Sequence, residues 1–217
     1  MDYQHLITFI MEMLGTVAFA SSGAMTAVEK NMDIFGVSVL GVVTATGGGL
    51  IRDLVLGITP PGMFRDPVYA LAAIVTSCCL FWILYAKKEW LSGAFRATYD
   101  KIMLAFDAVG LGIFTAVGIF TAVQNGYQDN LFLLIFVGTI TGVGGGILRD
   151  VLAGETPYIF VKHVYACASL AGALFYVLLQ EPFGQVTAMF GTSALVILLR
   201  FLAAHYKWNL PRLKGSV

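Results

Sequence analysis

The sequence predicts an all-α membrane protein with seven transmembrane helices, arranged as two inverted three-helix repeats followed by a seventh helix. Three observations lead to this fold class. Of the 217 residues, 58% are hydrophobic and only 12% are charged, which is outside the usual balance of a soluble globular domain. The apolar stretches are long enough to cross a bilayer. The second half of the chain also repeats motifs of the first.

Seven stretches meet the requirement of roughly 20 mostly apolar residues per helical crossing. The loops between them are short, so we expect one membrane domain over residues 1–217 and no soluble domain. The expected spans are residues 5–28, 34–56, 67–86, 102–124, 130–153, 163–180 and 184–204.

Basic residues gather in the loops on one side of this expected bundle, and only Arg65 lies on the other side. Because cytoplasmic loops carry an excess of Lys and Arg, we expect the N-terminus outside and the C-terminus in the cytoplasm. The residues on the basic side are Lys30, Lys87, Lys88, Arg96, Lys101, Lys162, Lys207, Arg212 and Lys214.

A glycine motif occurs twice at equivalent places in the chain. GGGLIRD begins at Gly47 and GGGILRD begins at Gly144, and the tripeptide VYA begins at Val68 and again at Val164. Each repeat, residues 5–86 and residues 102–180, holds three spans, so the second copy enters the membrane from the opposite side. Residues 184–204 form the unpaired seventh helix. Such inverted repeats are typical of transporters and channels, with the functional site near the midplane between the halves.

The glycine triplets fall just past the middle of the second and fifth spans. A glycine costs up to about 1 kcal/mol relative to alanine in a helix, so we expect a kink or a break in both helices there. Freed backbone groups are tolerated in hydrocarbon only inside protein or beside a water-filled cavity. The bare carbonyls and nearby hydroxyls would then suit a cation. The alternative is that the glycines only let helices pack closely. The residues concerned are Gly47, Gly48, Gly49, Gly144, Gly145 and Gly146, with the hydroxyls of Thr44, Thr46 and Thr141.

Each repeat also carries an acid on a stripe of its first helix. The spacings of 3, 4 and 4 place Glu12, Gly15, Phe19 and Gly23 on one helix face, and Asp107, Gly110, Phe114 and Gly118 are their equivalents. Acids inside a span usually face the bundle interior. The two phenylalanines could form a hydrophobic constriction that gates by dewetting, or could be ordinary packing.

The arginines of the two motifs are candidate partners for these acids. Inverted topology places Glu12 and Arg52 in the outer half of the membrane, and Asp107 and Arg149 in the inner half, so we expect each pair to be close. Adjacent helical residues point in different directions, so Arg52 and its neighbour Asp53 should separate. The four acids and two arginines leave a formal charge of −2, which favours cations over anions. Alternatively, both Arg-Asp pairs only cap and anchor helix ends near the headgroups.

The doubled GGG-x-x-RD, with a Gly and a Pro downstream of each copy, resembles the TRIC family, the trimeric intracellular cation channels and their prokaryotic relatives. The resemblance covers essentially the whole chain. It implies a homotrimer in a prokaryotic plasma membrane, surrounded by membrane lipid. Each protomer would hold its own pore, lined by the first, second, fourth and fifth spans and bent at the glycine motifs. K⁺ or Na⁺ would bind only transiently, with no cofactor and no tightly bound metal.

A second reading is a small-solute transporter, because the same sequence domain is also described as a bacterial glycine transporter domain. A broken helix presents amide N–H groups on one side and carbonyls on the other, which suits a zwitterion as well as a cation. An enzyme is not expected, since no nucleophile and base pair can be assigned and GGGLIRD lacks the Lys-Ser/Thr ending of a phosphate-binding loop. Nucleic acid is not an expected partner, because the formal net charge is zero.

Overall fold

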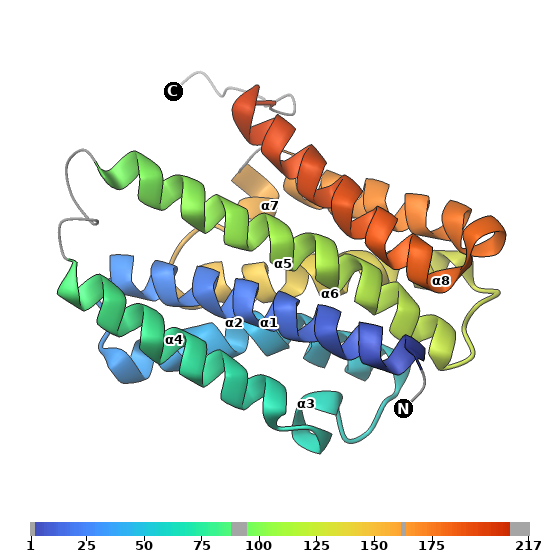
Figure 1. Ribbon diagram of the computed structural model, residues 1–217, viewed down its shortest axis with the longest axis horizontal. Helices are drawn as coiled ribbons and strands as arrows, with labels where there is room; N and C mark the ends of the chain where they lie inside the picture. Colours follow the sequence, from blue (N-terminus) through green and yellow to red (C-terminus); the bar gives the residue numbers. More distant parts are fainter. Residues whose placement is uncertain (1–2, 88–94, 162–163, 209–217) are drawn as a thin grey trace, which may run out of the picture.

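The chain folds into a bundle of long helices that lie roughly along one axis (Figure 1). The structure, a computed structural model, describes residues 3–87, 95–161 and 164–208. Six helices in these ranges are long and apolar enough to cross a membrane. They are α1 (Tyr3–Glu29), α2 (Ile34–Leu56), α4 (Val68–Ala86), α5 (Arg96–Gln124), α6 (Leu131–Leu152) and α8 (Tyr165–His205), and the short helices α3 (Gly62–Arg65) and α7 (Tyr158–Val161) follow α2 and α6.

Helix α8 contains two of the expected spans. Its 41 residues would extend about 60 Å if straight, roughly twice the thickness of the hydrocarbon core. The helix is bent at Gly184, which has φ 78° and ψ 164°, a backbone conformation essentially restricted to glycine. The orange and red arms on either side of the bend fold back alongside each other (Figure 1), and Thr192 of the second arm donates to the Gly172 carbonyl of the first.

Helices α2 and α6 begin and end in the same way, as expected for repeat-related elements. Asp33 caps the start of α2 by accepting a hydrogen bond from the Gly36 N–H at 2.8 Å, and Asn130 caps α6 by accepting one from the Leu133 N–H at 3.1 Å. Gly57 follows α2 with φ 70°, and Gly154 closely follows α6 with φ 72°. These left-handed glycines turn the chain toward the short helices α3 and α7.

The predicted breaks at the glycine triplets are wrong, because α2 and α6 continue through them as regular helices. The triplets instead let the two helices cross with their backbones in contact. A Cβ added to Gly48 would lie 2.1 Å from the Thr141 carbonyl oxygen, and one on Gly145 would lie 2.1 Å from the Thr44 carbonyl oxygen. The helical cost of glycine is therefore offset by close packing, which is the alternative that the sequence left open.

Close packing also accounts for the glycines of the acid-bearing stripes. Gly23 of α1 packs against Thr44 of α2, and the equivalent Gly118 of α5 packs against Thr141 of α6. Phe19 occupies the space beside Gly110, where a Cβ would lie 2.0 Å from its ring. Each repeat thus supplies small residues that bring its first and second helices together.

The outside of the bundle is strongly apolar. Side chains such as Phe132, Phe35 and Leu178 are 80%, 75% and 73% exposed, which is the pattern of a surface that faces lipid rather than water. The all-α membrane fold is confirmed for the part of the chain that the structure describes.

Candidate functional site

A buried arginine in the second half of the chain links three helices. Arg149 Nη1 donates to Asp107 Oδ1 at 2.8 Å and to Ser22 Oγ at 2.5 Å, which joins α6 to α5 and α1. The Arg149 and Asp107 side chains are only 1% and 2% exposed. The predicted proximity of Asp107 and Arg149 is confirmed, and the contact is a fully buried ion pair.

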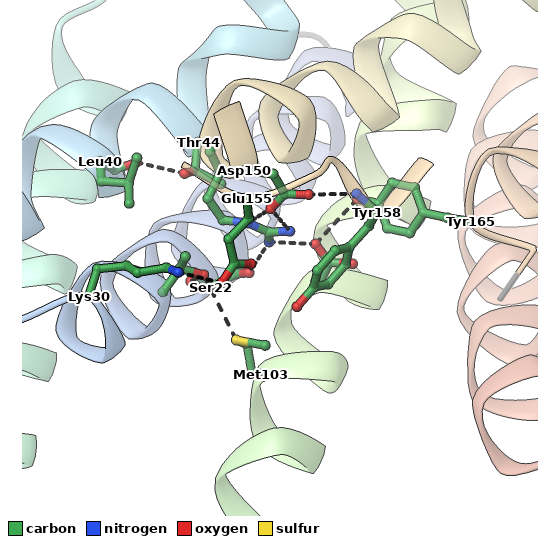
Figure 2. Close-up of polar contacts among 12 residues, drawn as sticks. Ser22, Lys30, Leu40, Thr44, Met103, Asp150, Glu155, Tyr158 and Tyr165 are labelled. Carbon is green, nitrogen blue, oxygen red and sulfur yellow. Dashed lines mark hydrogen bonds and ion pairs between the residues drawn. The ribbon is translucent and has the colours of Figure 1, made fainter. Parts of the chain in front are cut away.

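Asp107 has a second arginine beside it, which comes from the last arm of α8. Arg200 Nη2 lies 3.6 Å from Asp107 Oδ2, and its guanidinium lies over the Tyr165 ring, 4.6 Å from the centroid. The Tyr165 hydroxyl donates to Asp107 Oδ1 at 3.2 Å. Asp107 is therefore held between two guanidinium groups and a phenol. Figure 2 shows Tyr165 beside Tyr158 at this cluster.

Glu12 occupies the equivalent position in the first half, in a looser arrangement. Arg52 Nη1 lies 4.0 Å from Glu12 Oε1, so this predicted proximity is also confirmed. The Tyr69 hydroxyl donates to Glu12 Oε2 at 2.5 Å, as its repeat equivalent Tyr165 does to Asp107. The Arg52 and Glu12 side chains are 11% and 22% exposed. The Glu12 cluster is therefore partly exposed, whereas the Asp107 cluster is almost fully buried.

The expectation that Arg52 points away from Asp53 is wrong, and Arg149 contacts Asp150 in the same way. Arg52 Nε donates to Asp53 Oδ1, and Arg149 Nε donates to Asp150 Oδ1, both at 2.8 Å. The long arginine side chain can curl back along the helix, which overcomes the divergence of the two Cβ atoms. The single guanidinium group of each motif thereby contacts two acids. These are Glu12 and Asp53 for Arg52, and Asp107 and Asp150 for Arg149.

Both aspartates also anchor the short helix that follows. Asp53 Oδ2 accepts from the Gly62 N–H at 2.7 Å, and Asp150 Oδ2 accepts from the Tyr158 N–H at 2.8 Å, a contact drawn in Figure 2. Gly62 and Tyr158 are the first residues of α3 and α7, where an anionic acceptor is favoured. The aspartates therefore cap helix ends, as the alternative expected, but the arginines also form ion pairs, so the motif does more than anchor helix ends.

The two acids line separate cavities. The cavity at Glu12, which we call the Glu12 cavity, has a volume of about 150 Å³, and the one at Asp107, the Asp107 cavity, about 310 Å³. Glu12 lies in the first half of α1, and Glu29, which lines the other cavity, ends that helix, so the cavities lie toward opposite ends of the bundle. The Glu12 cavity is lined by Glu12, Thr16, Ala45, Thr46, Gly49, Leu50, Arg52, Asp53, Gly62, Met63, Asp66, Tyr69 and Phe114, and the Asp107 cavity by Glu29, Arg96, Asp100, Met103, Leu104, Asp107, Glu155, Tyr158, Arg200 and Ala204.

Tightly packed residues separate the two cavities. The rings of Phe19 and Phe114 are in contact, with centroids 5.3 Å apart, and Phe19 is 1% exposed. The hydroxyls of Thr44 and Thr141 donate to the Leu40 and Val137 carbonyls of their own helices, both at 2.6 Å. The region between the two cavities is therefore filled by the aromatic pair and by the crossing of α2 and α6.

The remaining predicted residues divide between a cavity wall and this crossing. Thr46 and Gly49 line the Glu12 cavity. A Cβ on Gly47 would meet Leu148, one on Gly144 would meet Ile51, and one on Gly146 would meet the Tyr165 hydroxyl, so these glycines serve packing.

Comparisons with known proteins identify the family. The family model described as "Glycine transporter" matches residues 9–85 and 104–181. A UPF0126 membrane protein of Vibrio cholerae is 37% identical over 206 residues, covering 94% of this chain and 82% of its own. The inner membrane protein YadS of Escherichia coli is 34% identical, with 94% of both chains covered.

Solved structures also resemble this chain over most of its length. A crystal structure of a prokaryotic TRIC channel is 33% identical, with a TM-score of 0.85 and coverage of 95% of this chain and 100% of that one. The TRIC trimeric intracellular cation channel orthologue from Rhodobacter sphaeroides is 34% identical, with a TM-score of 0.82 and coverage of 93% and 99%. The chain belongs to the TRIC family. It is a multi-pass protein of the plasma membrane, as its inner-membrane relatives and apolar helices indicate.

Ion pairs also form among and beside the residues that line the Asp107 cavity in this TRIC-family protein. Lys30 Nζ lies 2.8 Å from Glu155 Oε1, a contact visible in Figure 2, and Arg96 pairs with Glu29. The hydrogen bond from Lys30 to Glu155 raises the pKa of Lys30 above its ordinary value. These pairs tie the end of α1 to the start of α5 and to the loop between α6 and α7.

Sequence reasoning missed Arg200 and the two tyrosines that bind the acids. The two tyrosines could have been identified from the sequence, because Tyr69 and Tyr165 are the central residues of the repeated VYA. Arg200 carried a weaker signal, an arginine inside the apolar run of the last span, and its partner in α5 is visible only in the folded chain. Arg200 also changes the formal charge of the predicted site. Four acids now face three arginines, which leaves −1 rather than −2.

Proposed function

We propose that this TRIC-family protein is a monovalent cation channel that conducts K⁺ and Na⁺ passively through a pore within each protomer. One observation carries the proposal. Two carboxylate-lined cavities lie toward opposite ends of the bundle, and the packed rings of Phe19 and Phe114 lie between them. Two solved TRIC structures that resemble this chain over most of its length are described as cation channels, which supports the same function here.

The proposed path runs from the Glu12 cavity past Phe19 and Phe114 to the Asp107 cavity. Carboxylates at both ends replace part of the hydration of a passing cation and hold it only transiently, so no cofactor or resident metal is required. In the closed arrangement described above, the aromatic pair and the helix crossing block the path. Conduction then requires α2 and α6 to shift relative to α1 and α5, without a break at the glycine triplets.

The proposed channel crosses the membrane seven times and assembles as a homotrimer within membrane lipid. The two arms of α8 supply the sixth and seventh crossings. This count agrees with the places of the ends, since α1 begins at one end of the bundle and α8 ends at the other (Figure 1). The basic residues place the N-terminus outside, although Lys88, Lys162, Arg212 and Lys214 lie outside the described residues. The trimer follows the description of the Rhodobacter sphaeroides relative.

The direct test is K⁺ flux through the purified protein in liposomes. We expect K⁺-driven potential changes with the native chain and a several-fold smaller rate with Glu12→Gln, because the variant removes a carboxylate from the cavity wall. Asp129→Asn is the matched control, since it removes an exposed carboxylate from the loop between α5 and α6. No K⁺ flux through the native chain, or equal losses in both variants, would contradict the proposal.

The alternative function is transport of a small solute, with glycine as the first candidate, because the matching family model carries that description. The Glu12 cavity offers both a carboxylate and a guanidinium group to a zwitterion. Uptake of labelled glycine by the same liposomes separates the two functions. Saturable glycine uptake without K⁺ flux would favour the transporter.

A further inference from the structure

The Glu12 cluster and the Asp107 cluster differ in one charged residue. In the Glu12 cluster, Glu12 and Asp53 face a single guanidinium group, that of Arg52, which leaves a formal charge of −1. In the Asp107 cluster, Asp107 and Asp150 face two guanidinium groups, which leaves zero. The additional positive charge belongs to Arg200, which lies outside both repeats.

The surroundings of Arg200 place its charge where a passing cation would have to bind. Its Nη2 atom lies 3.6 Å from Asp107 Oδ2, and both side chains line the Asp107 cavity. The other carboxylate oxygen of Asp107 already accepts hydrogen bonds from Arg149 and Tyr165. Oδ2 is therefore the oxygen that Asp107 can offer to a cation, and Arg200 covers it.

We propose that Arg200 is a tethered cation that competes with permeating K⁺ or Na⁺ for Asp107 and thereby limits conduction through the inner half. The proposal rests on the cation-channel function above and adds a residue that controls it. A cation can pass Asp107 only when the guanidinium group moves aside. The stacking of Arg200 on the Tyr165 ring offers it a second favourable contact when it releases the carboxylate.

The proposal separates the charge of Arg200 from its shape. If charge matters, loss of Arg200 gives Asp107 an uncovered oxygen and lowers the K⁺ concentration that half-saturates conductance. The expected shift is roughly tenfold, the order for one unit charge within about 10 Å of a path in partly solvated protein. If Arg200 only fills space, a neutral side chain of similar length would conduct as the native chain does.

Single-channel recording in planar bilayers over a series of KCl concentrations tests this distinction. The informative variants are Arg200→Met, which keeps length and removes charge, and Arg200→Lys, which keeps charge. Arg200→Gln is a second neutral variant in case one of them folds poorly, and thermal melting in detergent checks each. Lys101→Gln is the matched control, because Lys101 is exposed on α5 near the same end of the bundle and does not line the cavity.

We expect both neutral variants to half-saturate at roughly tenfold lower K⁺, and Arg200→Lys and Lys101→Gln to match the native chain. A conducting native chain with an unchanged Arg200→Met would overturn the role of Arg200 and leave the channel function intact. The same holds if Arg200→Lys shifts as far as Arg200→Met. A native chain that passes no K⁺ current would overturn the channel function and this inference together.

Discussion

At the residue scale, Glu12 and Asp107 show how burial changes the contribution of an ion pair to stability. Asp107 lies 2.8 Å from Arg149 with both side chains nearly inaccessible, whereas Glu12 lies 4.0 Å from Arg52 beside an open cavity. Removing one partner of a buried pair strands the other charge in a low-dielectric environment. If one partner of the Glu12 and Arg52 pair is removed, water that enters the Glu12 cavity can solvate the charge of the other.

We therefore expect Asp107→Asn to destabilise the protein by about 3 kcal/mol, because Arg149 loses one of its two carboxylates. Glu12→Gln should cost about 1 kcal/mol or less, since its cluster is partly solvated. Thermal or denaturant unfolding in one detergent compares the two variants. Equal losses of stability would mean that the two clusters are not as different in solvation as their exposures indicate.

The glycine triplets allow a second test at the same scale, within three residues of one motif. Gly48→Ala should destabilise the protein by about 1–3 kcal/mol, because its methyl group would lie 2.1 Å from the Thr141 carbonyl oxygen of α6. Gly49→Ala is the control, since its Cβ would meet only Arg52 at 3.8 Å. The gain in helix propensity should leave it as stable as the native chain or up to about 1 kcal/mol more stable. A harmless Gly48→Ala in unfolding experiments would contradict the backbone contact.

At the element scale, the helices were predictable because hydropathy and length determine them. The spans expected at residues 34–56 and 67–86 lie within one residue of α2 and α4. The triplet breaks could not be excluded from sequence, because the helical cost of glycine is local while the backbone of α6 that offsets it is distant. The prediction that Arg52 and Asp53 separate was wrong for a related reason. Helix geometry describes the directions of the Cβ atoms and not the reach of a long side chain.

The bend of α8 depends on one backbone conformation. At φ 78° and ψ 164°, Gly184 lies in a region that other residues enter at a cost of about 1–3 kcal/mol. Gly184→Ala should lower the free energy of unfolding by that amount, while Phe183→Ala, at the preceding position with a side chain 63% exposed, should change it much less. Melting curves of the two purified variants make the comparison. A larger loss in Phe183→Ala would show that side-chain contacts, and not the glycine backbone, maintain the bend.

At the scale of the whole molecule, the two halves of the chain form two cavities with different closures. The end of the bundle at the Asp107 cavity is closed by the Arg149 and Arg200 cluster and by ion pairs that join α1 to α5 and to the loop before α7. The Glu12 cavity has the looser pair of Arg52 with Glu12 and the pair of Arg52 with Asp53. If the basic loops face the cytoplasm, the more tightly closed end is the cytoplasmic one, so orientation decides from which side the path is sealed.

Cysteine labelling in intact cells determines that orientation. In a background in which Cys78, Cys79 and Cys167 are replaced by alanine, we expect a membrane-impermeant maleimide to label Asp129→Cys from outside. Lys207→Cys should react only after the membrane is permeabilised, because it follows α8 on the basic side. Labelling of Lys207→Cys alone would reverse the orientation and place the sealed end outside. Labelling of both sites in intact cells would leave an even number of crossings between them, and α8 would then have to cross the membrane differently from its two folded arms.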